Sequence, residues 1–279
     1  MPHRRTVNVD GVELSVVANR PGTPRRLLLL HGTFWSRVWT PIMAALGDSL
    51  VVAALDFPGF GRSGGELDDR DASVPDLADL ALRTADVLGA REFTVAGHDI
   101  GGAVAQHLAV HASERVRQLV LVNSVLYDSW PVPAVARFRD PETRMATTPQ
   151  EFRDGRRLAL ARATTRDLGE DATAEYLSPW QDEPRIRSWM AMAAAADARY
   201  TLDLLPALRE QAPSTLVLWG ADDEFQPVSY AERFAAEVPS AQLVTVVGAR
   251  HIPMEDDPER VAGELLAFLE LVTITEVAG

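Results

Sequence analysis

Asp99 is the residue of this chain whose surroundings most strongly indicate chemistry. It lies in the segment GHDIGG, which follows the apolar run FTVAG and precedes the helical pattern AVAQHLAV. Gly97 and Gly101 leave room for backbones to approach one another at a strained turn from strand to helix. The N-terminus of a helix also favours an anion. The pattern indicates a nucleophile elbow with aspartate as the nucleophile, and an ordinary helix N-cap is the alternative.

A carboxylate nucleophile favours a particular class of substrate. Attack on an ester carbonyl would give an anhydride and expel a poor leaving group, whereas attack on an sp³ carbon of a halide or epoxide gives a stable ester. A histidine can then activate water to hydrolyse that ester, while N–H donors hold the tetrahedral intermediate. The expected chemistry is hydrolysis of a small, largely apolar molecule through an alkyl-enzyme ester.

His251 is the candidate for the water-activating histidine. It lies in a short loop after the apolar run QLVTVV, and Ile-Pro-Met and a helical pattern follow it. An acid should hold one of its ring nitrogens and so fix the tautomer. Asp222, Asp223 and Glu224 all follow the run STLVLWG and are the candidates for that acid.

The elements that position these residues alternate between short apolar runs and longer helical patterns. This alternation predicts an α/β fold with a mostly parallel central sheet and helices on both faces. Asp10-Gly11 lies between two alternating runs and predicts a hairpin of edge strands. Buried strands are predicted over residues 26–30, 50–55, 93–97, 116–122, 214–220 and 242–247. Helices that cover the sheet are predicted over residues 37–46, 75–88, 100–112, 228–237 and 258–271.

Residues 126–212 break this alternation. They contain many prolines, no convincing strand and clusters of Trp, Met and Ala. Such clusters suit helices that pack over an apolar space, although core packing would also explain them. We predict a core domain formed by residues 1–125 and 213–279, and a helical cap at 126–212 that roofs the active site.

The order of these motifs resembles the α/β-hydrolase superfamily over nearly the full length of the chain. His31-Gly32 follows one strand and DFPGFGRS follows the next, and LVLWGADDEFQP and GARHIPMEDDP come later. The resulting order of nucleophile, acid and histidine is the one that the α/β-hydrolase fold requires. The sequence GHD in place of GHS resembles the branch of epoxide hydrolases and haloalkane or haloacid dehalogenases.

The resemblance implies roles for particular residues. The family's spacing places the acid at Asp223, three residues after Gly220, which completes a catalytic triad with Asp99 and His251. Asn123 occupies the position from which some relatives supply the acid, which also supports Asp223.

An oxyanion hole is implied at the backbone N–H groups of Thr33 and Ile100. Substrate contacts are expected from aromatic side chains near the elbow and in the cap: Phe34, Trp35, Tyr127, Trp130, Trp189 and Tyr200.

The chain departs from the family pattern at two points, so the sequence does not decide whether the substrate is an epoxide or a halide. Epoxide hydrolases usually supply two cap tyrosines as donors to the leaving group. In this chain the position where one of these tyrosines is expected falls near Met192. Haloalkane dehalogenases usually place tryptophan after the nucleophile, and here Ile100 follows it. Two alternatives therefore stay open. One is a natural-product enzyme that uses Asp99 as a base for cyclisation or lactone chemistry, and the other is a non-catalytic small-molecule receptor.

Composition excludes several classes of partner. The chain of 279 residues has 27 Lys and Arg against 40 Asp and Glu, a net charge of −13 that repels nucleic acid and anionic lipid. It has no cysteine, which excludes disulfides and thiolate chemistry. No apolar run is long enough for a membrane span, and we expect a cytoplasmic protein with a small-molecule substrate. The sequence leaves the oligomeric state open.

Two motifs resemble sites for cofactors or metals. Gly59, Gly61 and Gly64 form a GxGxxG pattern, but acidic and polar residues follow where a pyrophosphate-binding helix should begin. His107 and His111 share a helix face, but no HExxH glutamate separates them, so we expect a solvated face. We therefore expect neither a cofactor nor a metal.

Overall fold

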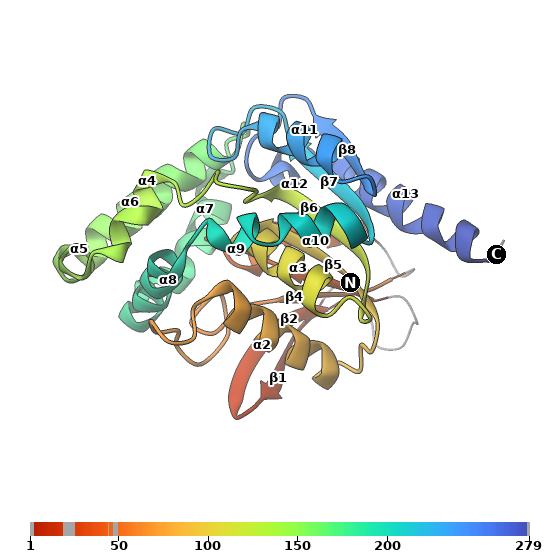
Figure 1. The fold of residues 1–279 in the computed structure, drawn as a ribbon. Helices are drawn as coiled ribbons and strands as arrows, with labels where there is room; N and C mark the ends of the chain where they lie inside the picture. Colours follow the sequence, from red (N-terminus) through yellow and green to blue (C-terminus); the bar gives the residue numbers. More distant parts are fainter. Residues whose placement is uncertain (1–2, 19–25, 44, 47–49, 278–279) are drawn as a thin grey trace.

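The computed structural model describes residues 3–18, 26–43, 45–46 and 50–277, and within this range eight strands form one sheet (Figure 1). Their order across the sheet is β1-β2-β4-β3-β5-β6-β7-β8. The pairs β1–β2 and β2–β4 are antiparallel, and the other pairs are parallel. The strands are β1 (His3–Val9), β2 (Val12–Ala18), β3 (Arg26–Leu30), β4 (Val51–Leu55), β5 (Phe93–Asp99), β6 (Val116–Ser124), β7 (Ser214–Gly220) and β8 (Ala241–Val246).

The six predicted runs form β3 to β8, so the predicted mostly parallel sheet is confirmed. The prediction that the strand at 242–247 is buried is wrong, because β8 lies at an edge of the sheet and only its Val246 is buried. The N-terminal hairpin is also confirmed, with Asp10 and Gly11 at φ values of 51° and 87° in its turn. The prediction that both hairpin strands lie at an edge is wrong for β2, which pairs with β4 as well as β1. Leu14 and Val16 of β2 are fully buried, which explains why this strand lies inside the sheet.

The helices that cover the sheet form near the predicted positions. They are α2 (Val74–Val87), α3 (Ile100–His111), α11 (Val228–Glu237) and α13 (Pro258–Val277), and a short α12 (Pro253–Asp256) that was not predicted precedes α13. The predicted helix at 37–46 is instead a 3-10 helix, η1 (Ser36–Trp39), followed by a short α1 (Thr40–Met43), and residue 44 lies outside the described residues. Pro41 has no N–H to donate to the preceding turn, which accounts for this break. None of the described helices combines the length and apolar character needed to cross a membrane.

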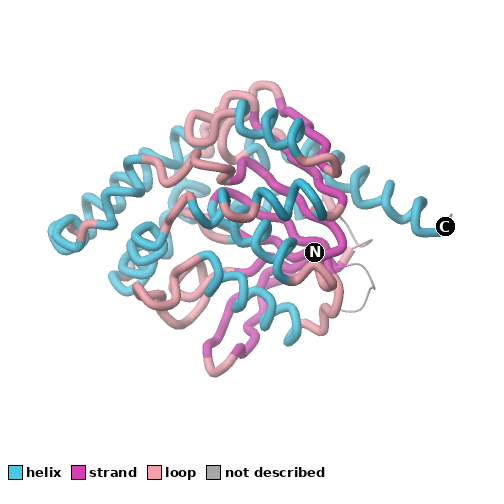
Figure 2. The backbone as a smooth tube through the Cα atoms, in the orientation of Figure 1, coloured by secondary structure: helices cyan, strands magenta, loops and turns pink. Residues whose placement is uncertain are grey.

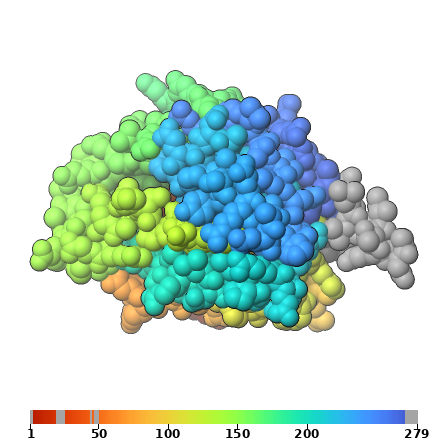
Figure 3. All heavy atoms as spheres, turned by 45° about the horizontal axis from the view of Figure 1, so that its top comes forward, coloured from red at the N-terminus to blue at the C-terminus, as the bar shows by residue number. Residues whose placement is uncertain are grey.

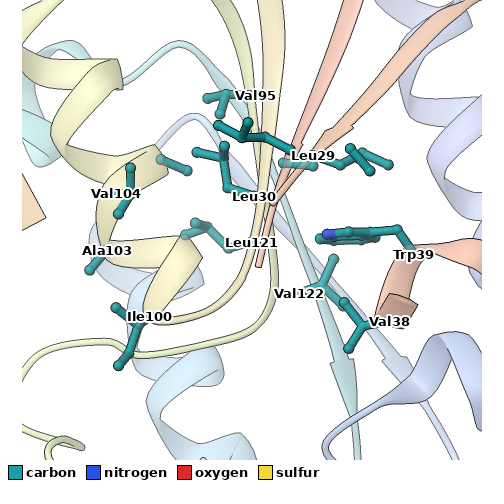
Figure 4. Close-up of a cluster of buried hydrophobic side chains, with 14 of the residues drawn as sticks. Leu29, Leu30, Val38, Trp39, Val95, Ile100, Ala103, Val104, Leu121 and Val122 are labelled. Atoms are coloured by element: carbon teal, nitrogen blue, oxygen red, sulfur yellow. The ribbon is translucent and has the colours of Figure 1, made fainter. Parts of the chain in front are cut away.

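The core lies on both faces of the sheet. Figure 4 shows Ile100, Ala103 and Val104 of α3 on one side of the strands, and Val38 and Trp39 of η1 on the other. Helices α2 and α3 pack together, and α1, α12 and α13 form a second packed group. This layering holds the carboxyl end of β5, where Asp99 lies, in the middle of the sheet.

The chain between β6 and β7 contains helices and loops but no strand in Figure 2. Figure 3 shows its green part beside the blue C-terminal region. Two of its helices, α9 and α10, contact α3 of the sheet layer. Its helices are α4 (Pro133–Ala136), η2 (Arg137–Arg139), α5 (Pro141–Ala146), α6 (Pro149–Ala163), α7 (Gly169–Leu177), η3 (Ser178–Gln181), α8 (Glu183–Ala195), α9 (Arg199–Leu202) and α10 (Leu205–Gln211).

Truncation of a central core side chain tests this packing. Leu29 on β3 is fully buried, so we expect Leu29→Ala to lower the free energy of unfolding by about 3 kcal/mol, through lost burial and a cavity. Urea denaturation measures this change. Val247→Ala is the control, because the side chain of Val247 is 89% exposed and its truncation should change stability by less than about 0.5 kcal/mol. Equal stabilities for the two variants would contradict the described core.

Candidate active site

The turn between β5 and α3 contains a strained backbone conformation at Asp99. Asp99 ends the strand with φ 55° and ψ −127°, a strained conformation for a residue other than glycine. A Cβ atom on Gly97 would lie 2.2 Å from the carbonyl oxygen of Gly101, and one on Gly101 would lie 2.5 Å from that of Leu30. Glycine at these two positions therefore allows the turn to close and hold Asp99 at the start of α3.

The Asp99 carboxylate is held from one side by the loop after β3. Its Oδ2 atom accepts the Thr33 N–H at 2.8 Å and the Thr33 hydroxyl at 2.7 Å. A Cβ atom on Gly32 would lie 2.6 Å from both Asp99 Oδ2 and the Ile100 amide nitrogen, so this amide lies beside the carboxylate. Within the described part of the chain Asp99 Oδ1 makes no hydrogen bond, which leaves this oxygen for a bound molecule.

His31 holds the loop that carries Thr33. Its Nδ1 lies 2.9 Å from the Gly32 carbonyl oxygen, and its Nε2 accepts the Phe57 N–H at 3.0 Å. Burial lowers the pKa of His31, which favours the neutral ring that can both donate and accept. His31 thereby joins the loops after β3 and β4.

His251 and Asp223 form a buried pair behind the pocket. His251 Nδ1 lies 2.9 Å from Asp223 Oδ2, and the same oxygen accepts the Asn123 side-chain amide at 2.7 Å. Asp223 Oδ1 accepts the N–H groups of Phe225 and Gln226 at 2.7 and 3.1 Å. Asn123 therefore helps to hold the Asp223 carboxylate in place.

The charges around His251 favour its protonated form. Burial alone lowers its pKa, but the carboxylate and hydrogen bond of Asp223, together with the charge of Asp99, outweigh burial and raise the pKa above its ordinary value. His98 differs, because burial and the nearby His251 lower its pKa to about 4. The Nε2 atom of His98 lies 2.8 Å from the backbone oxygen of His251, so His98 contacts the loop that carries His251.

A pocket of about 310 Å³ lies next to the elbow, between the sheet and the helices that connect β6 to β7. These helices, residues 133–211, are called the helical segment below. Apolar side chains from both regions line the pocket: Phe34, Val135, Phe138, Phe152, Trp189 and Phe225. Its polar lining includes Thr33, Asp99, Arg156, Gln226 and His251. The nucleophile and the histidine of the expected triad therefore face one largely apolar cavity, with Asp223 directly behind the histidine.

The structure brings some of the expected substrate contacts to the pocket and leaves others outside it. Phe34 and Trp189 line the pocket, whereas Trp35, Tyr127, Trp130 and Tyr200 are not part of its lining. The Trp35 indole donates to the Tyr176 carbonyl, the Trp130 indole to Thr201, and the Tyr127 hydroxyl to Glu237. These side chains face internal partners because they pack between elements and not around the cavity.

Sequence reasoning missed Arg156 and Gln226. Arg156 lies on α6, where the buried residues Phe152, Arg156, Leu160 and Ala163 repeat at helical spacing. The sequence did contain a signal for Arg156, because this arginine lies among the apolar residues that form one face of α6. Gln226 follows the acid turn, and among the described residues its buried Oε1 has no hydrogen-bond partner.

The two motifs that resemble other sites have structural explanations. Gly59 and Gly61 have φ values of 70° and 51°, and a Cβ atom on Gly61 would lie 2.3 Å from the Asp56 carboxyl carbon, so these glycines form a turn around Asp56. The rings of His107 and His111 lie 4.2 Å apart on α3. In the portion of the chain that was searched, no three His, Asp or Glu side chains are grouped so as to hold a metal.

Comparison with known proteins matches residues 27–264 to the sequence model of the alpha/beta hydrolase family. A pimeloyl-[acyl-carrier protein] methyl ester esterase from Nitrosomonas europaea is 28% identical over 88% of this chain and 96% of its own length. Haloalkane dehalogenase 2 from Mycobacterium bovis is 27% identical over 88% of each chain. The crystal structure of a haloalkane dehalogenase loop variant from Bradyrhizobium elkanii superposes with a TM-score of 0.84 at 20% identity, covering 100% of this chain and 99% of that one. These matches confirm the predicted fold class.

The contact between His251 and Asp223 can be tested without any substrate. In Asp223→Asn we expect the pKa of His251 to fall, because the substitution removes the charge that opposes the effect of burial. NMR titration of the ring protons measures this pKa, with His251→Gln used to assign the resonance. An unchanged His251 pKa in Asp223→Asn would show that Asp223 does not control its charge.

Proposed function

The chain belongs to the alpha/beta hydrolase family, and we propose that it hydrolyses small, largely apolar molecules at an electrophilic carbon, with Asp99 as the nucleophile. The observation that carries this proposal is the environment of the Asp99 carboxylate. One of its oxygens is held by Thr33, and the residue lines the pocket that His251 also lines. An aspartate in the elbow is poorly suited to ester substrates, because attack on an ester carbonyl would form an anhydride.

In the first step, Asp99 Oδ1 forms a bond to an sp³ carbon of the substrate. With a haloalkane the carbon–halogen bond breaks and halide leaves with the electron pair. With an epoxide the ring C–O bond breaks, and the ring oxygen takes up a proton from solvent water. Either reaction leaves the substrate carbon attached to Asp99 as an ester. The Thr33 donors on Oδ2 orient the carboxylate for this attack.

In the second step, His251 takes a proton from water, and the resulting hydroxide adds to the carboxyl carbon of Asp99. The oxyanion then forms on Oδ2, where the Thr33 N–H already donates and the Ile100 amide lies close by. Collapse of this intermediate breaks the bond between the carboxyl carbon and Oδ1, so the alcohol product leaves with that oxygen. Asp223 stabilises the imidazolium that forms on His251.

The relatives include haloalkane dehalogenases and an ester hydrolase, and the pocket itself favours neither a halide nor an epoxide as leaving group. Among the residues that the structure describes, no tyrosine is part of its lining, and the Tyr176 hydroxyl donates to Glu255. The Trp189 indole donates to the Thr33 carbonyl oxygen at 2.9 Å and not toward the cavity. The proposed substrates therefore include both epoxides and halides, and the covalent intermediate distinguishes them.

A variant that blocks the second step tests the nucleophile. His251→Gln removes the water-activating base, so we expect it to accumulate an ester on Asp99 when it is incubated with mixed small epoxides and haloalkanes. Intact-protein mass spectrometry with peptide mapping measures the adduct. Its mass distinguishes retained epoxide oxygen from lost halide.

His111→Gln is the matched control for this experiment, because His111 is exposed on α3 and outside the pocket. It should turn over substrate and accumulate no adduct. A folded His251→Gln variant that forms no adduct across a broad panel would contradict nucleophilic attack by Asp99 and favour base catalysis or a receptor.

The pH dependence follows from the raised pKa of His251. The base must be neutral, so steady-state hydrolysis should fall as the pH drops through the pKa of His251 in the ester intermediate, which the charge of Asp223 raises. A pH–rate profile of kcat between pH 5 and 9 measures the acidic limb. If the rate increased toward acid pH, the histidine would not act as the base.

A further inference from the structure

Arg156 is a buried cation in the wall of the proposed active site. Its side chain on α6 lines the pocket and the residue is 7% exposed. The guanidinium lies over the rings of Phe34, Trp180 and Trp189, with distances of 4.2, 5.0 and 5.0 Å from its central carbon to the ring centroids. Three aromatic faces thus replace water around the charge.

This guanidinium lacks the partners that a buried cation normally requires. Among the described residues, no carboxylate lies within ion-pair distance of Arg156. Its Nη2 donates to the Thr33 carbonyl oxygen at 2.9 Å, and its buried Nε has no hydrogen-bond partner in the part of the chain that is described. Burial lowers the pKa of Arg156 to about 9, and Asp99 is the anion that opposes this effect, so the group is still charged at neutral pH. A buried charge with most of its donors unmatched is costly unless a ligand completes it.

Resting on the proposed function for the reacting carbon, we propose that Arg156 binds a carboxylate of the substrate. The guanidinium presents donors in a fixed planar fork that matches a carboxylate. Arg137 and Glu151 also line the pocket and carry opposite charges, so Arg156 beside the negative Asp99 suits a monoanion better than a phosphate dianion. Cation–π contact with three rings contributes to holding the charge but uses none of its N–H donors.

The position of Arg156 limits where the reactive carbon lies in such a substrate. Thr33 donates its N–H to Asp99 Oδ2 and accepts Arg156 Nη2 on its carbonyl oxygen, so nucleophile and cation contact opposite groups of one residue. The electrophilic carbon should therefore lie next to the carboxylate, as in a 2-haloacid or a 2,3-epoxy acid. The apolar walls leave room for an aliphatic or aromatic body. The product of a 2-haloacid would be a 2-hydroxy acid.

A binding experiment tests the carboxylate site independently of turnover. Isothermal titration at pH 7.5 compares 4-methylpentanoate with 4-methylpentanamide, which have nearly the same shape but differ in charge. We expect the wild-type protein to bind the carboxylate at least about tenfold more tightly, because hydrogen bonds to charged groups contribute roughly 1.5–3 kcal/mol. Arg156→Met should abolish this preference. Arg157→Met is the matched control, because Arg157 is exposed on the same helix, and it should retain the preference.

A kinetic experiment separates recognition from positioning. The substrates are 2-bromo-4-methylpentanoate and its amide, whose reacting carbons are equivalent. In Arg156→Met we expect kcat/KM for the acid to fall about 100-fold and that for the amide to change less than about threefold. Arg156→Lys retains the charge without the fork and should recover part of the acid activity. Circular dichroism confirms that each variant is folded.

Each outcome distinguishes this proposal from the proposed function. Preferred binding of the carboxylate without turnover of any substrate would support the anion site and contradict nucleophilic hydrolysis. Equal binding of acid and amide by the wild-type protein would overturn the anion site while leaving hydrolysis intact. Equal loss of activity toward both substrates in Arg156→Met would also overturn it, because Arg156 would then act by holding Thr33 or by binding the leaving group.

Discussion

The hydrogen bonds of Thr33 are the interaction on which the rest of the site depends. Its N–H and hydroxyl hold one oxygen of Asp99, and its carbonyl oxygen accepts Arg156 and the Trp189 indole from the helical segment. One residue therefore joins the elbow of the sheet to the helices above the pocket. A movement of those helices would be transmitted directly to the backbone that holds Asp99. This arrangement explains why a loop between η1 and β3 determines the geometry of the whole pocket.

The two carboxylates of the site differ because their environments differ. Both oxygens of Asp223 are occupied by hydrogen bonds, and although burial raises its pKa, the charge of His251 and these bonds lower it below the ordinary value. A carboxylate held in this way suits the role of orienting an imidazole. Asp99 is bonded on one oxygen and lines the cavity, which suits a nucleophile. Arg156 places a positive charge in the same pocket as Asp99, and this charge is the basis of the proposed carboxylate site.

The sequence was sufficient for those features that depend on local pattern. Short apolar runs predicted β3 to β8, and GHDIGG predicted the turn at Asp99, because a strained turn between a strand and a helix requires glycines at fixed positions. The inside position of β2 depended on long-range pairing with β4 and was missed. Residues of the helical segment were also hard to assign, because the side that faces the pocket is decided by how the helices dock. Trp130 and Tyr127 therefore find internal partners, while Arg156, one of four arginines in α6, faces the cavity.

The origin of the product oxygen tests the central claim, that Asp99 attacks the substrate carbon, most directly. A single turnover with enzyme in excess over an epoxide or a haloalkane is run in 18O-labelled water, and both product and Asp99 peptide are analysed by mass spectrometry. Nucleophilic attack by Asp99 predicts an unlabelled new hydroxyl in the product and one labelled oxygen in the carboxylate of Asp99. A labelled hydroxyl in the product, with an unlabelled Asp99, would show that water attacks the substrate directly and would contradict the account.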